Sequence, residues 1–303
     1  MKVGICCEGP GVWASGDFIR RSAQASERHG FSSYWFGEHV ILFGSYKSKY
    51  PYSGVASWSS SGSGEAPIPD PRTSFPDPII GMSWAAAATT TLEVGTSILI
   101  LPQRNPVILA RELSCMDDYS NGRVTLGVGV GWCQEEAEAI GVDWGKRGKL
   151  TDEYIKVMRT LWGNDAASIR TENFAFEDVY MYPTPVRNRQ VPILVGGDSD
   201  LALKRVAHNG DGWIAFSVKV NEAAEKVARL KQLTREQGRD PETLRLSMAC
   251  FSWTTEDDLK RYREAGFNEF LLYLCCELSV DDTELNEQLA AASHKFVDVV
   301  RDW

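Results

Sequence analysis

Two adjacent residues, Glu38 and His39, are candidates for acid–base chemistry in this chain of 303 residues. They follow the aromatic run 33–36 after a single glycine, and the residue types of that run favour a β-strand. Histidine changes charge near neutral pH, which suits it to proton transfer or to a hydrogen bond with a substrate oxygen. The alternatives are that His39 is satisfied within a loop and that Glu38 is only a solvated neighbour. We predict that both residues are catalytic.

A glycine-rich turn, 196–199, joins another apolar run to the start of an expected helix. Backbone N–H groups at a helix N-terminus bind anions, and small residues let a phosphate approach them. Asp198 would repel a phosphate. The expected contacts are therefore Gly196, Gly197, Ser199 and the backbone amides beside them. An ordinary turn with an aspartate or serine cap explains the same residues without any ligand.

Aromatic residues follow three further apolar runs, at Trp132, Phe216 and Trp253. Their rings either wall a planar ligand or pack among themselves. Glycines occupy alternate positions over 127–131, which places them on one face of a strand. Something must approach the backbone closely on that face. Together these residues suit a large planar ligand with a polar tail.

The elements that position these residues alternate between short apolar runs and amphipathic stretches about eight times. This number predicts an α/β fold, a closed (β/α)₈ TIM barrel, in which the loops after the strands carry the site. We expect one domain over 1–303, a long loop near 40–76 and an insertion near 165–190. An open doubly wound sheet is the alternative, but no G-x-G-x-x-G motif follows the first strand. The expected strands are 2–7, 33–36, 92–99, 124–130, 192–195, 212–216, 244–251 and 270–274.

The composition limits the binding partners and the cellular location that we expect for this protein. The net charge is −9 and no basic stripe is present, so we expect no nucleic-acid partner. No apolar run is long enough to cross a membrane, and the first residues do not have the pattern of a signal peptide. The seven cysteines show neither a disulfide framework nor metal-type spacing. We expect a reduced, cytoplasmic protein without a metal site.

Over residues 30–215 the chain resembles a known family, the bacterial luciferase-like monooxygenases and their deazaflavin-dependent relatives. Each motif is short, but the ordered set at this spacing is specific. The C-terminal quarter matches only in its pattern. The motifs are Gly30-Phe31, Trp35–Val40, Phe75–Pro78, Thr91–Thr96, Leu101–Pro106, Gly122–Val124, Gly127–Trp132, Val191–Gly197 and Gly210–Trp213.

The resemblance implies a (β/α)₈ barrel that binds reduced FMN or, in the branch this chain resembles most, coenzyme F-420. It implies a cis peptide bond at Ser97-Ile98 against the back of the flavin ring, and it places the pair 38–39 beside that ring. It also implies that the glycine pair 196–197 contacts the phosphate tail. Gly131 and Trp132 are assigned to the cofactor site because they directly follow the fourth expected strand. Trp132 stands where sugar-phosphate dehydrogenases of this superfamily carry a catalytic glutamate, which puts their mechanism in doubt.

Three functions remain open at this point. The first is an oxidoreductase or monooxygenase that uses reduced coenzyme F-420 or FMN on a small organic substrate, with the 40–76 loop closing over the site. The second is a flavin-binding protein without turnover of its own, and the third is a metal-independent barrel hydrolase or lyase. The resemblance also implies a homodimer, with helices 77–88 and 106–119 as candidates for the interface. The Ser/Gly-rich stretch 53–66 is expected to change the shape of the barrel opening through which the substrate enters.

Overall fold

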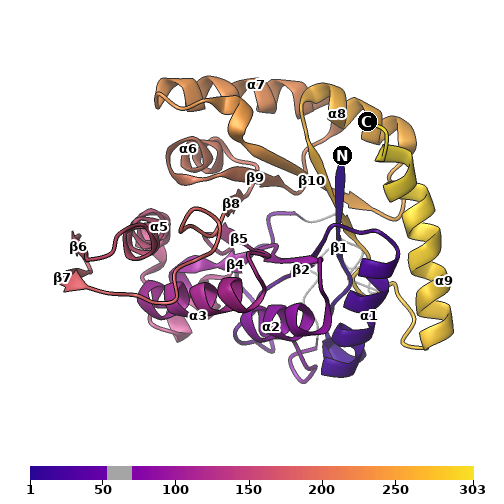
Figure 1. The fold of residues 1–303 in the computed structure, drawn as a ribbon, viewed down its shortest axis with the longest axis horizontal. Helices are drawn as coiled ribbons and strands as arrows, with labels where there is room; N and C mark the ends of the chain where they lie inside the picture. Colours follow the sequence, from indigo (N-terminus) through magenta and orange to yellow (C-terminus); the bar gives the residue numbers. More distant parts are fainter. Residues whose placement is uncertain (53–69) are drawn as a thin grey trace.

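The computed structural model describes residues 1–52 and 70–303, so the stretch 53–66 lies outside the described residues. Within them, eight parallel strand positions close into a barrel surrounded by helices (Figure 1). The predicted (β/α)₈ fold is confirmed. The sheet runs in the order β3-β2-β1-β11-β10-β9-β8-β5, and pairing of β3 with β5 closes it. The barrel strands are β1 (Lys2–Cys6), β2 (Ser33–Phe36), β3 (Glu93–Thr96) with its continuation β4 (Leu99–Ile100), β5 (Val124–Gly129), β8 (Ile193–Gly196), β9 (Gly212–Ala215), β10 (Arg245–Phe251) and β11 (Glu269–Tyr273).

The helices begin where the sequence supplies caps. The Asp77 carboxylate accepts the N–H groups of Ile79 and Ile80 at 2.9 and 3.0 Å, which starts α2. Proline occupies the first turn of both α2 and α3, where its missing N–H is not needed. No helix in the described part of the chain is long and apolar enough to cross a membrane. The helices around the barrel are α1 (Gly16–Arg28), α2 (Pro78–Ala88), α3 (Pro106–Tyr119), α5 (Arg147–Gly163), α6 (Asp200–Asn209), α7 (Val220–Glu236), α8 (Glu256–Ala265) and α9 (Asp282–Ala292).

Three expectations about the elements need correction. The expected strand 92–99 is two strands, β3 and β4, because the ladder stops at residues 97–98. A short helix, α4 (Gln134–Ala139), follows β5 and was not predicted. The expected last helix, 281–300, ends its α-helical part at Ala292 and continues as a π-helical segment.

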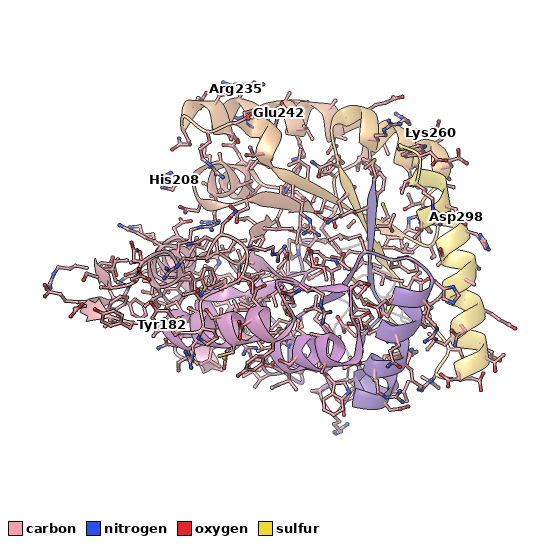
Figure 2. The ribbon with its side chains drawn as sticks, viewed as in Figure 1. Tyr182, His208, Arg235, Glu242, Lys260 and Asp298 are labelled. Atoms are coloured by element: carbon pink, nitrogen blue, oxygen red, sulfur yellow. The ribbon has the colours of Figure 1, made fainter. Side chains whose placement is uncertain are left out.

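The predicted insertion is an antiparallel hairpin of β6 (Ala167–Arg170) and β7 (Ala175–Val179). It projects from the barrel beside α5 (Figure 1). Asp165 joins its two ends, since its carboxylate accepts from the Tyr182 hydroxyl at 3.0 Å and pairs with Arg189 at 2.7 Å. Figure 2 shows Tyr182 on the side of this hairpin, away from the barrel axis.

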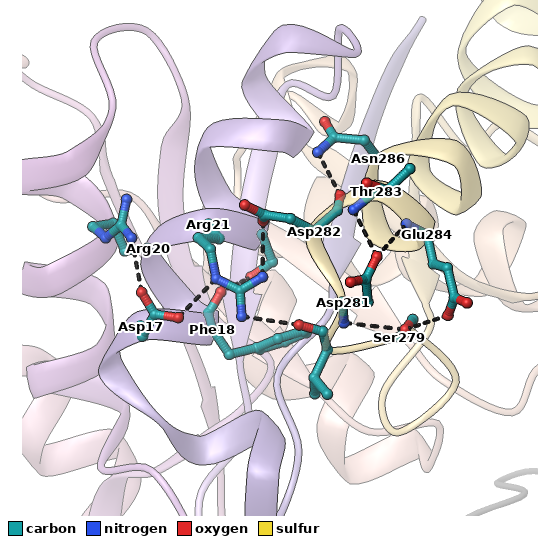
Figure 3. Close-up of polar contacts among 12 residues, drawn as sticks. Asp17, Phe18, Arg20, Arg21, Ser279, Asp281, Asp282, Thr283, Glu284 and Asn286 are labelled. Atoms are coloured by element: carbon teal, nitrogen blue, oxygen red, sulfur yellow. Dashed lines mark hydrogen bonds and ion pairs between the residues drawn. The ribbon is translucent and has the colours of Figure 1, made fainter.

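The first and last units of the barrel are joined by Arg21 of α1. Its guanidinium pairs with Asp17 at 2.7 Å and with Asp282 of α9 at 2.8 Å, and it donates to the Val280 carbonyl at 3.1 Å (Figure 3). These contacts fix α9 against α1, so the two ends of the chain hold the barrel closed on this side.

Polar residues fill the amino-terminal end of the barrel. Arg245, at the start of β10, pairs with Glu93 at 2.6 Å and through Nε with Glu269 at 2.7 Å. Its guanidinium lies 5.3 Å from the centre of the fully buried Trp35 ring. This end is therefore closed, and access to the interior must come from the carboxyl ends of the strands.

Candidate active site at the carboxyl ends of the strands

His39 is held by a buried carboxylate that the sequence did not reveal. Its Nδ1 atom lies 3.0 Å from Oε2 of Glu136, a residue of α4 whose side chain is fully buried. The other Glu136 oxygen accepts the Val40 N–H at 2.5 Å. Because the carboxylate engages Nδ1, the Nε2 atom of His39 is the ring nitrogen left for a ligand. The arrangement is that of an oriented acid–base histidine.

Replacing Glu136 with glutamine is expected to lower turnover by roughly ten- to a hundredfold, because the amide no longer fixes the tautomer or stabilises the protonated ring. Nitrogen NMR of the histidine ring checks the cause, since the proton on Nδ1 should become mixed between the two nitrogens. Glu138→Gln, an exposed position on the same helix, is the matched control. Unchanged tautomer and turnover in Glu136→Gln would contradict this role.

Glu38 is buried against a cation. Its carboxylate accepts from Nε of Arg104 at 2.9 Å and from the Ile100 N–H, and Arg104 also pairs with Asp77 at 2.7 Å. Burial raises the pKa of Glu38, and the neighbouring Arg104 opposes that shift. Glu38 therefore ties the turn after β4 to the start of α2. Its predicted catalytic role stays a prediction.

The peptide bond between Ser97 and Ile98 is cis, as the resemblance implied. The Ser97 hydroxyl bonds to that of Tyr273 across the barrel mouth. A Cβ on Gly196 would lie 2.7 Å from the Ile98 side chain, and one on Gly129 would overlap it. The alternate glycines 127–131 are thus explained by the close approach of the neighbouring segment 96–100, through its backbone at Gly127 and through its side chains at the other two, without a ligand.

The turn after β8 keeps its backbone amides at the start of α6. Gly197 has φ of +113°, a conformation that favours glycine. The Ser199 hydroxyl accepts the Ala202 N–H at 3.2 Å, so it caps the helix, as the alternative interpretation held. The Asp198 carboxylate accepts the Ser217 N–H at 2.8 Å. This hydrogen bond holds the carboxylate against the segment after β9, and the backbone amides at the start of α6 are the groups of the turn that suit an anion.

Aromatic rings form a row across the barrel mouth. The Trp132 ring lies 5.8 Å from His39 and 5.2 Å from Tyr50, measured between ring centres. At the other end Phe216 lies 5.2 Å from Tyr52, and the two tyrosine rings are 5.7 Å apart. Trp132 and Phe216 are thus brought into one row with His39.

Trp253, in contrast, lies outside this row. Its ring stacks on Phe251 with centres 4.7 Å apart, and 54% of the residue is exposed. Phe251 in turn contacts Phe216. Trp253 therefore extends the aromatic surface outward, and does not line the centre of the mouth.

The two tyrosines of the row come from the loop after β2, which Glu135 holds in place. Its carboxylate accepts from the Ser48 hydroxyl at 2.6 Å and from the Ser48 N–H at 3.0 Å. The Ser48 contact lowers the pKa of Glu135 to about 2. No periodic pattern in the sequence marks Tyr50 or Tyr52, because residues 37–52 form neither helix nor strand.

These features define the class of (β/α)₈ barrel proteins whose site lies at the carboxyl ends of the strands. The chain belongs to the luciferase-like monooxygenase family, whose model matches residues 1–296. It is 30% identical over 274 residues to an uncharacterized protein of Mycobacterium tuberculosis, covering 89% of this chain and 92% of that one. It is 29% identical over 192 residues to pyrimidine monooxygenase RutA of Acinetobacter baylyi, covering 60% and 51%.

Solved structures share the fold at low identity. An F420-dependent secondary alcohol dehydrogenase in complex with an F420-acetone adduct superposes with a TM-score of 0.75 at 18% identity, covering 100% of both chains. The monooxygenase RslO1 of Streptomyces bottropensis gives 0.74 at 16% identity, covering 98% of this chain and 99% of that one. At these identities the likeness shows a shared barrel fold.

Proposed function

We propose that the protein is an oxidoreductase that uses a reduced flavin, either coenzyme F-420 or FMN, to transform a small organic substrate. The observation that carries the proposal is His39, fixed by Glu136 at 3.0 Å and placed edge-on to Trp132 in the aromatic row. An oriented histidine beside a planar apolar surface supplies both a proton donor and a ring site.

The residues at the mouth fit a planar ring with an anionic tail. The cis segment 97–98 and the aromatic row offer apolar surface for the ring. At the turn a Cβ on Gly197 would lie 3.2 Å from that of Ala202, which favours glycine there, and the backbone amides at the start of α6 suit a phosphate. Tyr50 and Tyr52 lie between Trp132 and Phe216, so entry of a ring there requires both tyrosines to move.

A bound reduced deazaflavin would supply a hydride, and a bound reduced FMN would supply electrons to oxygen or substrate. The side chains of the protein supply the proton and the environment for the reaction. Nε2 of His39 donates a hydrogen bond or a proton to the substrate oxygen, and Glu136 stabilises the charged ring through Nδ1. The aromatic row excludes water from the reacting atoms.

Titration of the protein with FMN, reduced FMN and reduced coenzyme F-420 tests the proposal through tryptophan emission. We expect quenching with at least one reduced ring, because Trp132 belongs to the row. No change with any of the three would contradict the proposal and would favour a hydrolase or lyase on the same barrel.

We further propose a homodimer that forms through α2 and α3. Large apolar side chains are exposed on both helices: Ile80 and Trp84 on α2, at 66% and 53%, and Ile108 and Tyr119 on α3, at 59% and 82%. Large exposed apolar side chains that gather on a surface mark association sites, and Ile80 and Trp84 lie one turn apart on α2. Sedimentation should show a dimer at micromolar concentration, and Trp84→Glu should shift it to monomer. A wild-type monomer would contradict the proposal.

A further inference from the structure

The carboxyl group of Glu8 is buried, and one of its two oxygens has no hydrogen-bond partner among the described residues. It follows β1 by two residues, and only 1% of the residue is exposed. Oε1 accepts the Gly37 N–H at 2.8 Å. Oε2 has no hydrogen-bond partner in the described part of the chain. Buried polar atoms without a partner are rare in folded proteins, and each requires an explanation.

The carboxyl lies against the proposed ring site. Gly37 directly precedes the pair Glu38-His39, and a Cβ on Gly37 would lie 3.7 Å from Oε1 of Glu8 and 4.0 Å from the Ser97 carbonyl. Glu8, the residues that follow β2 and the cis segment therefore meet at one point of the barrel mouth. This point lies at the carboxyl ends of β1, β2 and β3, away from the glycine turn that follows β8.

The groups that face Glu8 are neutral. They are Cys6 and Cys7 of the β1 end, Tyr34 of β2, and Cys275 and Cys276 after β11. Among the described residues, no lysine, arginine or histidine pairs with Glu8. Burial raises the pKa of Glu8 to about 7, opposed only by the Gly37 hydrogen bond. Near neutral pH the group therefore exists partly as the neutral acid.

We propose that Glu8 is a ligand-binding residue that carries a proton and donates a hydrogen bond from its free oxygen to an acceptor atom of the bound ring. The inference rests on the proposed function, because the ring is the ligand that would supply this acceptor. A neutral donor costs less to bury under a ligand than a carboxylate without a cation. Binding of the ring therefore takes up a proton at Glu8.

The protonation of Glu8 can be measured without any ligand. Infrared difference spectra of the protein should show a protonated carboxyl band near pH 6 that disappears as the pH rises through about 7. The band should be missing in Glu8→Gln and retained in Glu256→Gln, which changes an exposed glutamate of α8. Thermal melts of both variants establish that they are folded. No carboxyl titrating above about pH 6 would overturn the inference.

Binding of reduced FMN and reduced coenzyme F-420 is then measured near pH 6 and pH 8. The wild-type affinity should fall by about tenfold over this interval, since only the neutral acid donates. In Glu8→Gln that fall should disappear, because the amide stays neutral and still donates. If both proteins show the same pH dependence, the inference about Glu8 is wrong, while the proposed function stands. Oε2 would then face only water. If the wild type binds neither cofactor at either pH, both the proposed function and the inference are contradicted.

Discussion

Replacing His39 with alanine is expected to lower turnover by about 10²- to 10⁴-fold while the affinity for the reduced cofactor stays nearly unchanged. The imidazole is an oriented proton donor beside Trp132, and Glu136 holds it at 3.0 Å. The glycine turn and the cis segment, which we propose bind the cofactor, do not depend on this side chain. The measurement is steady-state turnover together with tryptophan quenching by the reduced ring.

His208→Ala is the control for this experiment, because His208 is exposed near the end of α6 and, among the described residues, its side chain bonds only to Gln237 (Figure 2). It should behave as the wild type. Full turnover by His39→Ala would show that the proton comes from elsewhere. Absence of turnover in the wild type with every acceptor, despite tight binding, would favour a flavin-binding protein.

Replacing Gly127 with alanine is expected to destabilise the fold by about 3 kcal/mol or more. The added Cβ would overlap the backbone carbonyl of Thr96 and lie 2.8 Å from the Ile214 side chain. The Thr96 hydroxyl also donates to the Gly127 carbonyl at 2.6 Å and accepts its N–H at 3.0 Å. These bonds fix the two strands at this distance, so the clash cannot be relieved by a rotamer change.

Urea unfolding measures the loss for Gly127→Ala against a matched control. In Gly44→Ala the added methyl group would meet nothing within 4 Å, so its free energy of unfolding should match that of the wild type. Equal stability of both variants would show that β3 and β5 can separate, and that the barrel is not closed as described.

The fold could be predicted because its strands are buried on both faces and read as short apolar runs between amphipathic helices. The run Val124–Gly129, for example, is buried at every position. Caps such as Asp77 fixed the helix starts closely. The break after β3 was not predicted, since neither a glycine nor a proline stands at residues 97–98, and only the family resemblance placed an unusual backbone feature there.

The site was predictable only where its residues directly follow strands. His39 and Gly197 do so, and their positions in the barrel follow from that fact. Glu136 and the tyrosines do not, because contacts between distant residues decide where they lie; Ser48 and Glu135 are 87 positions apart. The burial of Glu8 likewise depends on side chains of β2 and of the segment after β11. These side chains reach Glu8 only in the folded barrel, so the sequence does not show that Glu8 is buried.

The most direct test of the central claim is a crystal structure of the protein with reduced FMN or reduced coenzyme F-420 bound. We predict the ring against the cis segment 97–98, flanked by Trp132 and Phe216, with the phosphate on the amides of the turn at Gly197 and with Tyr50 and Tyr52 displaced. A mouth still filled by both tyrosines at saturating cofactor, or a ring bound elsewhere on the barrel, would contradict the account.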